Sequence, residues 1–104
     1  MATVQLRRYQ VKPGEMDDFV KWWPGVLPVR KQFGFDVLFA FVDESTNQFV
    51  WAVSHEGDTE EFDAAEKTYL ASPERTALFA GVPQRIDETF VTKVNVIHQI
   101  WPAG

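Results

Sequence analysis

Two short segments separated by a polar turn constrain the fold of this chain most. Residues 35–42 read FDVLFAFV and residues 49–55 read FVWAVSH. Both segments are rich in aromatic and β-branched residues, and residues 43–48 between them are mostly polar, so the pattern predicts a β-hairpin. Neither segment alternates apolar with polar residues, which is typical of strands that are covered on both faces. The sheet that contains this hairpin therefore needs cover on two sides.

A preferred register follows from matching large residues with small ones across the hairpin. A loop of two or four residues centred on residues 45–46 places Phe39 opposite Ala52 and Ala40 opposite Trp51, so that facing side chains fit. One face then carries Phe35, Val37, Phe39, Phe41, Val50 and Ala52. The other face carries Leu38, Ala40, Val42, Phe49, Trp51, Val53 and His55. A three-residue loop would exchange the faces of one strand.

The remaining elements complete an α+β pattern. We expect a strand at 4–11, a helix at 15–32 that bends at Pro24, a second helix after Asp58 or Thr59, a short third helix that starts at Ser72-Pro73, and a last strand at 88–100 followed by a tail at 101–104. The order is βαββαβ, which is typical of the ferredoxin-like fold. The expected architecture is one domain, residues 1–104, with helices on one face of a four-stranded antiparallel sheet.

The second face of that sheet has no cover within the chain. Nine Phe and four Trp are more than one small core conveniently buries, and leaving several large side chains in water forgoes several kcal/mol of hydrophobic stabilisation. A symmetric homodimer, with the two sheets face to face, is the simplest way to cover them.

Composition narrows the classes of partner and cofactor. The net charge is −5 and no basic run exceeds two residues, which argues against non-specific binding to nucleic acid. The chain has no Cys, and its two His have no spaced carboxylates, so we expect neither a metal site nor a tightly bound cofactor. Residues 1–4 lack a signal segment and no apolar run reaches 18 residues, so we expect a cytoplasmic protein without a membrane span.

Several short motifs resemble those of the NIPSNAP family. The start LRRYQVKPG, residues 6–14, is similar to the family's Leu-Arg-x-Tyr pattern followed by Pro-Gly. Gly34-Phe35 before the hairpin, Trp51 within it, and ASPE at residues 71–74 also resemble the family, although Val53 stands where an aromatic is common. The resemblance implies a dimeric α+β barrel with a pocket between sheet and helices or inside the barrel. The same superfamily includes cofactor-independent antibiotic-biosynthesis monooxygenases, polyketide cyclases and haem-degrading enzymes.

Five residues are candidates for a ligand site. Arg7 and Tyr9 share one face of the first strand, where Arg suits a carboxylate or enolate oxygen and Tyr can donate a hydrogen bond. Trp22 and Trp51 suit a flat hydrophobic ligand, and His55 suits proton transfer near neutral pH. Each also has an ordinary structural interpretation: an ion pair for Arg7, space filling for the aromatic residues, and a hydrogen-bonded strand end for His55.

Two classes of function remain after these arguments. The first is a homodimeric protein that binds or transforms a small hydrophobic, including aromatic, molecule, with Arg7, Tyr9 and His55 as the polar or catalytic set. Its enzymatic form would be a cofactor-independent monooxygenase, cyclase or isomerase of a tailoring pathway. The second is a non-catalytic interaction module, in which the aromatic residues serve assembly. The acidic residues Glu60, Glu61, Asp63 and Glu66 are expected on a solvated helix face.

Overall fold

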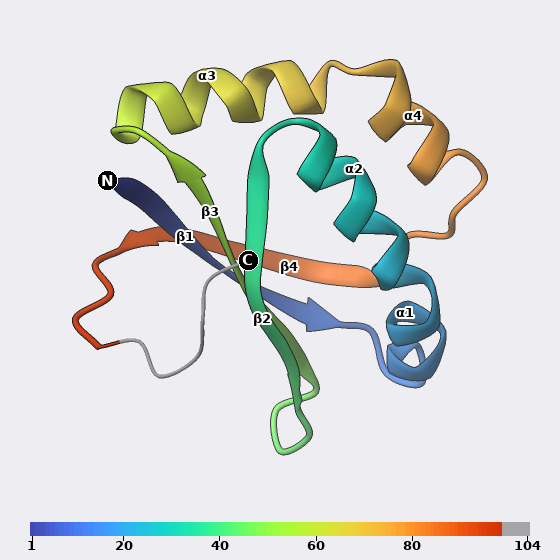
Figure 1. The fold of residues 1–104 in the computed structure, drawn as a ribbon. Helices are drawn as coiled ribbons and strands as arrows, with labels where there is room; N and C mark the ends of the chain where they lie inside the picture. The colour runs from blue at the N-terminus through green and yellow to red at the C-terminus, as the bar shows by residue number, and fades with distance from the viewer. Residues whose placement is uncertain (99–104) are drawn as a thin grey trace.

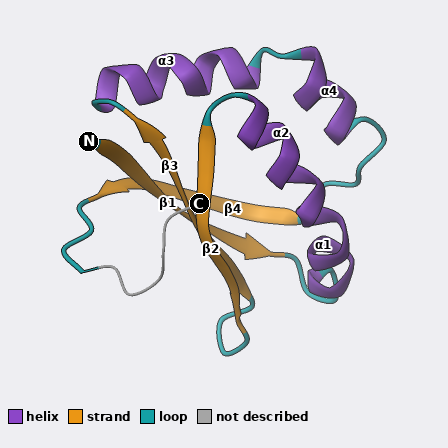
Figure 2. Ribbon diagram, viewed as in Figure 1, coloured by secondary structure: helices purple, strands orange, loops and turns teal. Residues whose placement is uncertain are grey.

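The computed structural model describes residues 1–98 of the chain. The elements in order are β1 (Ala2–Val11), α1 (Met16–Trp22), the 3₁₀ helix η1 (Trp23–Gly25), α2 (Val26–Gln32), β2 (Phe35–Asp43), β3 (Gln48–Glu56), α3 (Thr59–Leu70), α4 (Pro73–Phe79) and β4 (Ile86–Val94). The four strands form one antiparallel sheet in the order β2-β3-β1-β4, and the helices lie over one face of it (Figures 1 and 2). The ferredoxin-like α+β fold is therefore confirmed.

Helix boundaries follow the local sequence signals. The expected bend at Pro24 is present, because the first helical segment changes there into the 3₁₀ turn η1 before α2 begins. Asp58 caps α3 by accepting a hydrogen bond from the backbone N–H of Glu61 at 2.9 Å. Ser72 does the same for α4 with the N–H of Arg75 at 3.1 Å, and Pro73 occupies the first helical position.

The hairpin β2–β3 has the expected four-residue turn, but its faces differ from the expectation. Phe39 pairs with Ala52 as predicted, yet the register shifts between Val37 and Phe39 and leaves Leu38 as a bulge. On the N-terminal side of the bulge, Phe35 pairs with His55 and Val37 with Val53, so Phe35 and Val37 lie on the same face as Trp51 and Val53. The prediction that placed Phe35 and Val37 with Phe39 and Phe41 was wrong, because one extra residue exchanges the faces of everything before it.

The last strand is shorter than predicted and begins earlier. β4 starts at Ile86 rather than residue 88 and ends at Val94, so Val96 and His98 lie outside the strand. The rest of the expected strand and the tail that contains Trp101 lie outside the described residues. Along β1, the pairing with β4 shifts between Gln10 and Val11, which marks the irregular start of the strand.

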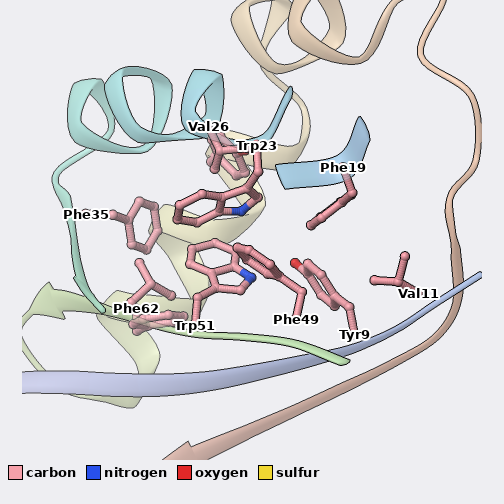
Figure 3. Packing of buried hydrophobic residues seen from close by; sticks show 11 residues of the cluster. Tyr9, Val11, Phe19, Trp23, Val26, Phe35, Phe49, Trp51 and Phe62 are labelled. Carbon is pink, nitrogen blue, oxygen red and sulfur yellow. The ribbon is translucent and has the colours of Figure 1, made fainter. Parts of the chain in front are cut away.

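The hydrophobic core lies between the sheet and the helices. Figure 3 shows Trp23 above Trp51, with Phe35 and Phe62 on one side and Tyr9, Phe49 and Phe19 on the other. The rings of Trp23 and Trp51 meet edge to face, with their centroids 5.4 Å apart.

No helix among the described residues is long and apolar enough to span a membrane.

The sheet face opposite the helices, called here the open sheet face, combines apolar and polar residues. By the strand registers its apolar residues include Val4, Leu6, Phe39, Phe41, Val50, Ala52 and Phe90. Its polar residues include Arg8, Gln10, Gln48, Ser54, Glu88 and Thr92. Phe41 on β2 and Phe90 on β4 are each 50% exposed, although they lie at opposite edges of the sheet. Helices cover one face only, as predicted.

Candidate functional site

A cavity of about 210 Å³ lies between the sheet and the helices. All four helices, the turn η1 and three of the four strands contribute to its wall. The lining residues include aromatic and aliphatic side chains from every layer: Tyr9, Phe19, Trp22, Trp23, Val26, Trp51, Tyr69, Leu70, Phe79 and Ile86. The charged lining residues are three arginines, Arg7, Arg30 and Arg75, and Gln84 and Thr89 complete the wall. Apolar walls with few polar groups are typical of small-molecule sites.

Arg7 and Tyr9 project from β1 into this wall because they alternate with Leu6 and Arg8, which face the other way. The Nε of Arg7 donates a hydrogen bond to the Tyr9 hydroxyl at 2.8 Å, and Arg7 Nη1 donates to Gln5 Oε1 at 2.8 Å. Because the Tyr9 oxygen accepts from Arg7, its own hydrogen is left to donate. This pair could therefore stabilise negative charge on a bound oxygen.

Two of the lining arginines, Arg7 and Arg30, form with Glu66 what we call the Arg–Glu–Arg cluster. Arg30 Nη1 donates to Glu66 Oε1 at 2.7 Å, and Arg7 Nη1 lies 3.6 Å from Glu66 Oε2. The Arg30 side chain is only 3% exposed and that of Glu66 14%. Burial lowers the pKa of Arg30 from its usual value; Glu66 opposes this effect and Arg7 adds to it. The cluster holds two cations for one carboxylate.

Both guanidinium groups of the cluster pack against aromatic rings. Arg7 Cζ lies 5.4 Å from the Trp51 ring centroid, and Arg30 Cζ lies 5.3 Å from the same ring. Arg30 Cζ is also 4.1 Å from the centroid of Tyr69. Trp51 and Tyr69 thus form a cation–π platform that holds the charges in place.

The more exposed part of the lining combines Arg75 with two aromatic residues. The rings of Trp22 and Phe79 meet edge to face at 4.9 Å, and Arg75 Cζ lies 4.3 Å from the centroid of Phe79. Arg75 is partly exposed, and the structure records no carboxylate within ion-pair distance of it among residues 1–98. A cation therefore lies beside an aromatic surface without a carboxylate partner in the described part of the chain.

Several donors buried in the same wall lack acceptors. Among the described residues, the indole N–H groups of Trp23 and Trp51 and the Nε–H of Arg30 have no hydrogen-bond partner. Such groups leave the positive ends of their dipoles uncompensated, which is costly in a low-dielectric interior. Together with the arginines they make the wall electropositive, although the chain as a whole carries a net charge of −5.

The structure brings four of the five candidate residues together. Arg7, Tyr9, Trp22 and Trp51 all line the cavity, although they come from three different elements. His55 lies elsewhere: its ring contacts Phe35 at a centroid distance of 4.9 Å, and its Nδ1 lies 2.8 Å from the carbonyl oxygen of Glu56. A role for His55 in the ligand site stays a prediction, without support from this placement.

Sequence reasoning missed Arg30, Glu66 and Arg75 as site residues. The expectation that Glu66 lies on a solvated helix face was wrong, since it follows Phe62 by four residues and precedes Tyr69 by three, which puts it on the buried stripe of α3. Arg30 follows Val26 by four residues and is buried for the same reason. A charged residue at a core position of a helix was the available signal.

In residues 1–98, no group of three or more His, Asp or Glu side chains is placed to hold a metal ion.

Comparison with solved structures places this architecture among known folds. A NIPSNAP family protein from Agrobacterium tumefaciens superposes with a TM-score of 0.78 at 11% identity, covering 91% of this chain and 92% of that one. A NIPSNAP-like domain protein from Burkholderia xenovorans gives 0.81 at 16% identity, covering 99% and 91%. A protein from Bacteroides thetaiotaomicron, provisionally assigned to the antibiotic biosynthesis monooxygenases, gives 0.70 at 17% identity, covering 93% and 90%.

These likenesses show the fold. The resemblance to NIPSNAP proteins indicated by the sequence motifs is confirmed at the level of the fold, with an antibiotic-biosynthesis monooxygenase-like protein among its neighbours. No family model and no curated protein sequence matches the chain.

Proposed function

We propose that this chain is a NIPSNAP-like protein that binds a small hydrophobic, in particular aromatic, molecule in the cavity between its sheet and helices. The observation that carries the proposal is the composition of the wall. Ten aromatic or aliphatic side chains surround a space of about 210 Å³, and Arg7 and Tyr9 supply an ordered polar pair within it. A wall of this kind excludes water from most of the ligand and fixes its orientation through few polar contacts.

A homodimer is the second part of the proposal. The open sheet face exposes half of Phe41 and half of Phe90 to solvent, and the partly exposed side chains of Val4, Leu6 and Phe39 lie on the same face. Apposition of two such faces would bury them and form a two-sheet barrel, with one cavity on the outer, helix-covered side of each sheet. Each chain would then be a single domain that contributes one sheet to the barrel and has its own ligand site.

A cofactor-independent monooxygenase, cyclase or isomerase reaction is the enzymatic form of the same proposal. It is favoured by the fold shared with the Bacteroides thetaiotaomicron protein and by the Arg7–Tyr9 pair, which is arranged to stabilise an enolate or phenolate oxygen. Under this form Arg7 and Tyr9 would contact the reacting oxygen. Under the alternative form, a non-catalytic module, the same residues would only orient the ligand.

Binding is tested by titrating the purified protein with a panel of single-ring and two-ring aromatic compounds. We expect at least one compound to raise the melting temperature and to change the fluorescence of the tryptophans, three of which line the cavity. The variant Trp22→Ala should weaken this binding, while Val20→Ala on the same helix but outside the cavity should not. A panel that leaves the melting temperature at the buffer value, with no molecule retained in native mass spectrometry, would favour the interaction module.

A further inference from the structure

The cavity wall is unusual in carrying three guanidinium groups and an apolar surface in one small space. Arg7, Arg30 and Arg75 all line it, and the carboxylate nearest to them, Glu66, lies behind the wall and already pairs with Arg30. Counting these four groups gives three positive charges and one negative charge. Like charges gathered in a low-dielectric site repel one another, and an additional anion would relieve that repulsion.

The hydrogen-bond inventory points in the same direction. Arg75 has no carboxylate partner among residues 1–98, the Tyr9 hydroxyl hydrogen is free to donate, and the buried indole N–H groups of Trp23 and Trp51 have no acceptor. Glu66 Oε2 is also buried without a hydrogen-bond partner in residues 1–98, but Glu66 does not line the cavity and this oxygen lies 3.6 Å from Arg7 Nη1. Within the lining itself, the buried side-chain atoms without partners are all donors. A ligand group that only accepts hydrogen bonds, such as a carboxylate, would complement this wall better than an amide or an alcohol.

The size of the cavity limits the rest of the ligand. Its volume is about 210 Å³, which is below the range of about 300–1,000 Å³ that is typical of sites for drug-sized molecules. An apolar cavity of about 150 Å³ is enough to hold benzene. One ring with a short acidic substituent therefore fits the available space, and the edge-to-face pair Trp22–Phe79 supplies an aromatic surface for that ring.

We propose that the ligand is a monocarboxylic acid with a single aromatic ring, whose carboxylate is held by Arg75 and Arg7 and whose ring lies against Trp22 and Phe79. This inference rests on the proposed function, since it names the class of molecule that the same cavity takes. Arg30 supplies a further fixed positive charge in the same wall, because its Nη1 is already bound to Glu66 Oε1.

The experiment compares three probes by isothermal titration calorimetry on the wild-type protein: benzoate, its neutral isostere benzamide, and acetate, which has the charge without the ring. We expect benzoate to bind about tenfold or more tightly than benzamide, the difference expected when a charge-assisted hydrogen bond replaces a neutral one. Acetate should bind more weakly than either. In a ¹H–¹⁵N spectrum, benzoate should move the indole resonances of Trp22, Trp23 and Trp51, assigned by Trp→Phe variants.

Two variants localise the charge. Arg75→Gln removes the guanidinium beside Phe79 without breaking an ion pair, and should weaken benzoate about tenfold or more while leaving benzamide unchanged. Arg8→Gln changes an arginine on the same strand as Arg7 but on the open sheet face, and should leave both affinities unchanged. Should Arg75→Gln fail to fold, the comparison of benzoate with benzamide on the wild type still decides whether the cavity prefers an anionic ligand.

Each contrary result has a distinct meaning. Benzamide binding as tightly as benzoate would overturn the anionic ligand and leave the proposed hydrophobic site standing. Acetate binding as tightly as benzoate would overturn the aromatic part of the inference. Absence of binding by all three probes and by the aromatic panel would overturn both the inference and the proposed function.

Discussion

At the scale of single residues, the Arg–Glu–Arg cluster links the stability of the fold to its candidate site. Glu66 is the carboxylate that compensates Arg30, whose side chain is 3% exposed. A buried ion pair contributes little net stability when both partners are present, yet loss of one partner leaves an unpaired charge in the interior. The cluster therefore fixes α3 against α2 and holds positive charge in the cavity wall.

The variant Glu66→Gln tests this dependence. It keeps the shape of the side chain but leaves Arg30 without a counter-charge, so we expect the free energy of unfolding to fall by about 3 kcal/mol. The measurement is urea unfolding followed by circular dichroism. Glu60→Gln, in the exposed first turn of the same helix, serves as the control and should cost less than about 1 kcal/mol. Equal effects of the two variants would contradict the role assigned to Glu66.

Gly34 is a second residue whose identity is required by its surroundings. Its φ is +87°, and a Cβ added there would lie 3.0 Å from Nε2 of His55. Gly14 has a similar φ of +78° but open space around it. Gly14→Ala should therefore cost about 1–2 kcal/mol from backbone strain alone, and Gly34→Ala should cost more.

A double-mutant cycle can test whether the extra stability cost of Gly34→Ala over Gly14→Ala comes from the His55 ring. Combining Gly34→Ala with His55→Ala removes the ring that the new methyl group would meet, so the two changes should cost less together than the sum of their separate costs. Thermal unfolding of the four proteins gives the coupling. Strict additivity would show that the ring moves aside freely and that only the backbone matters.

At the scale of elements, the sequence reveals features set by neighbouring residues, such as the start of a helix, more readily than contacts between distant residues. The start of α4 was predictable because Ser72 and Pro73 carry the cap and the first turn within two positions. The contact between Arg30 and Glu66 was not, because the two residues are 36 positions apart: helix spacing can place each on a buried stripe but cannot pair one with the other. Arg7 and Tyr9 were predictable as a pair because strand alternation alone puts them on one face.

The bulge at Leu38 is the element-scale feature that sequence reading missed. No Gly or Pro marks it, and both faces of β2 are apolar, so hydrophobic alternation could not reveal the change of register. Its consequence is large, because Phe35 reaches the core, where it is 1% exposed, only through the extra residue. For this reason the predicted sheet face was wrong for Phe35 and Val37, which precede the bulge, and correct for Phe39 and Phe41, which follow it.

Deleting Leu38 tests the bulge directly. The deletion would turn Phe35 and Val37 toward the open sheet face and leave a void beside Phe62, so we expect loss of cooperative unfolding or a cost of about 3–5 kcal/mol, as for removal of a core phenylalanine. Leu38→Ala keeps the extra residue and should cost clearly less. The measurement is thermal unfolding followed by near-ultraviolet circular dichroism. A deletion variant as stable as Leu38→Ala would show that the register can slip without penalty.

At the scale of the whole molecule, the sheet is covered by helices on one side and carries half-exposed phenylalanines on the other. The strand registers place Phe39, Phe41 and Phe90 on the open sheet face, and the rings of Phe39 and Phe41 stack with centroids 5.7 Å apart. Half-exposed phenylalanines on one sheet face are more typical of an interface than of solvent-exposed surface. Self-association through this face is a separate question from ligand binding, because the cavity lies on the other face.

The proposed dimer predicts a specific response to charge on that face. Phe41→Lys and Phe90→Lys, singly or together, place an ammonium group where two copies would meet, and burying unpaired charge costs more than such an interface can offset. We expect the wild type to sediment as a dimer at micromolar concentration and the double variant as a monomer that still melts cooperatively. Leu27→Lys is the matched control, because Leu27 is 40% exposed on α2, on the side of the helices. Two results would contradict the sheet-to-sheet dimer: a wild type that sediments as single chains, or a Leu27→Lys variant that dissociates as readily as the double variant. Neither result would bear on the cavity or its ligand, because the cavity lies on the other face of the sheet.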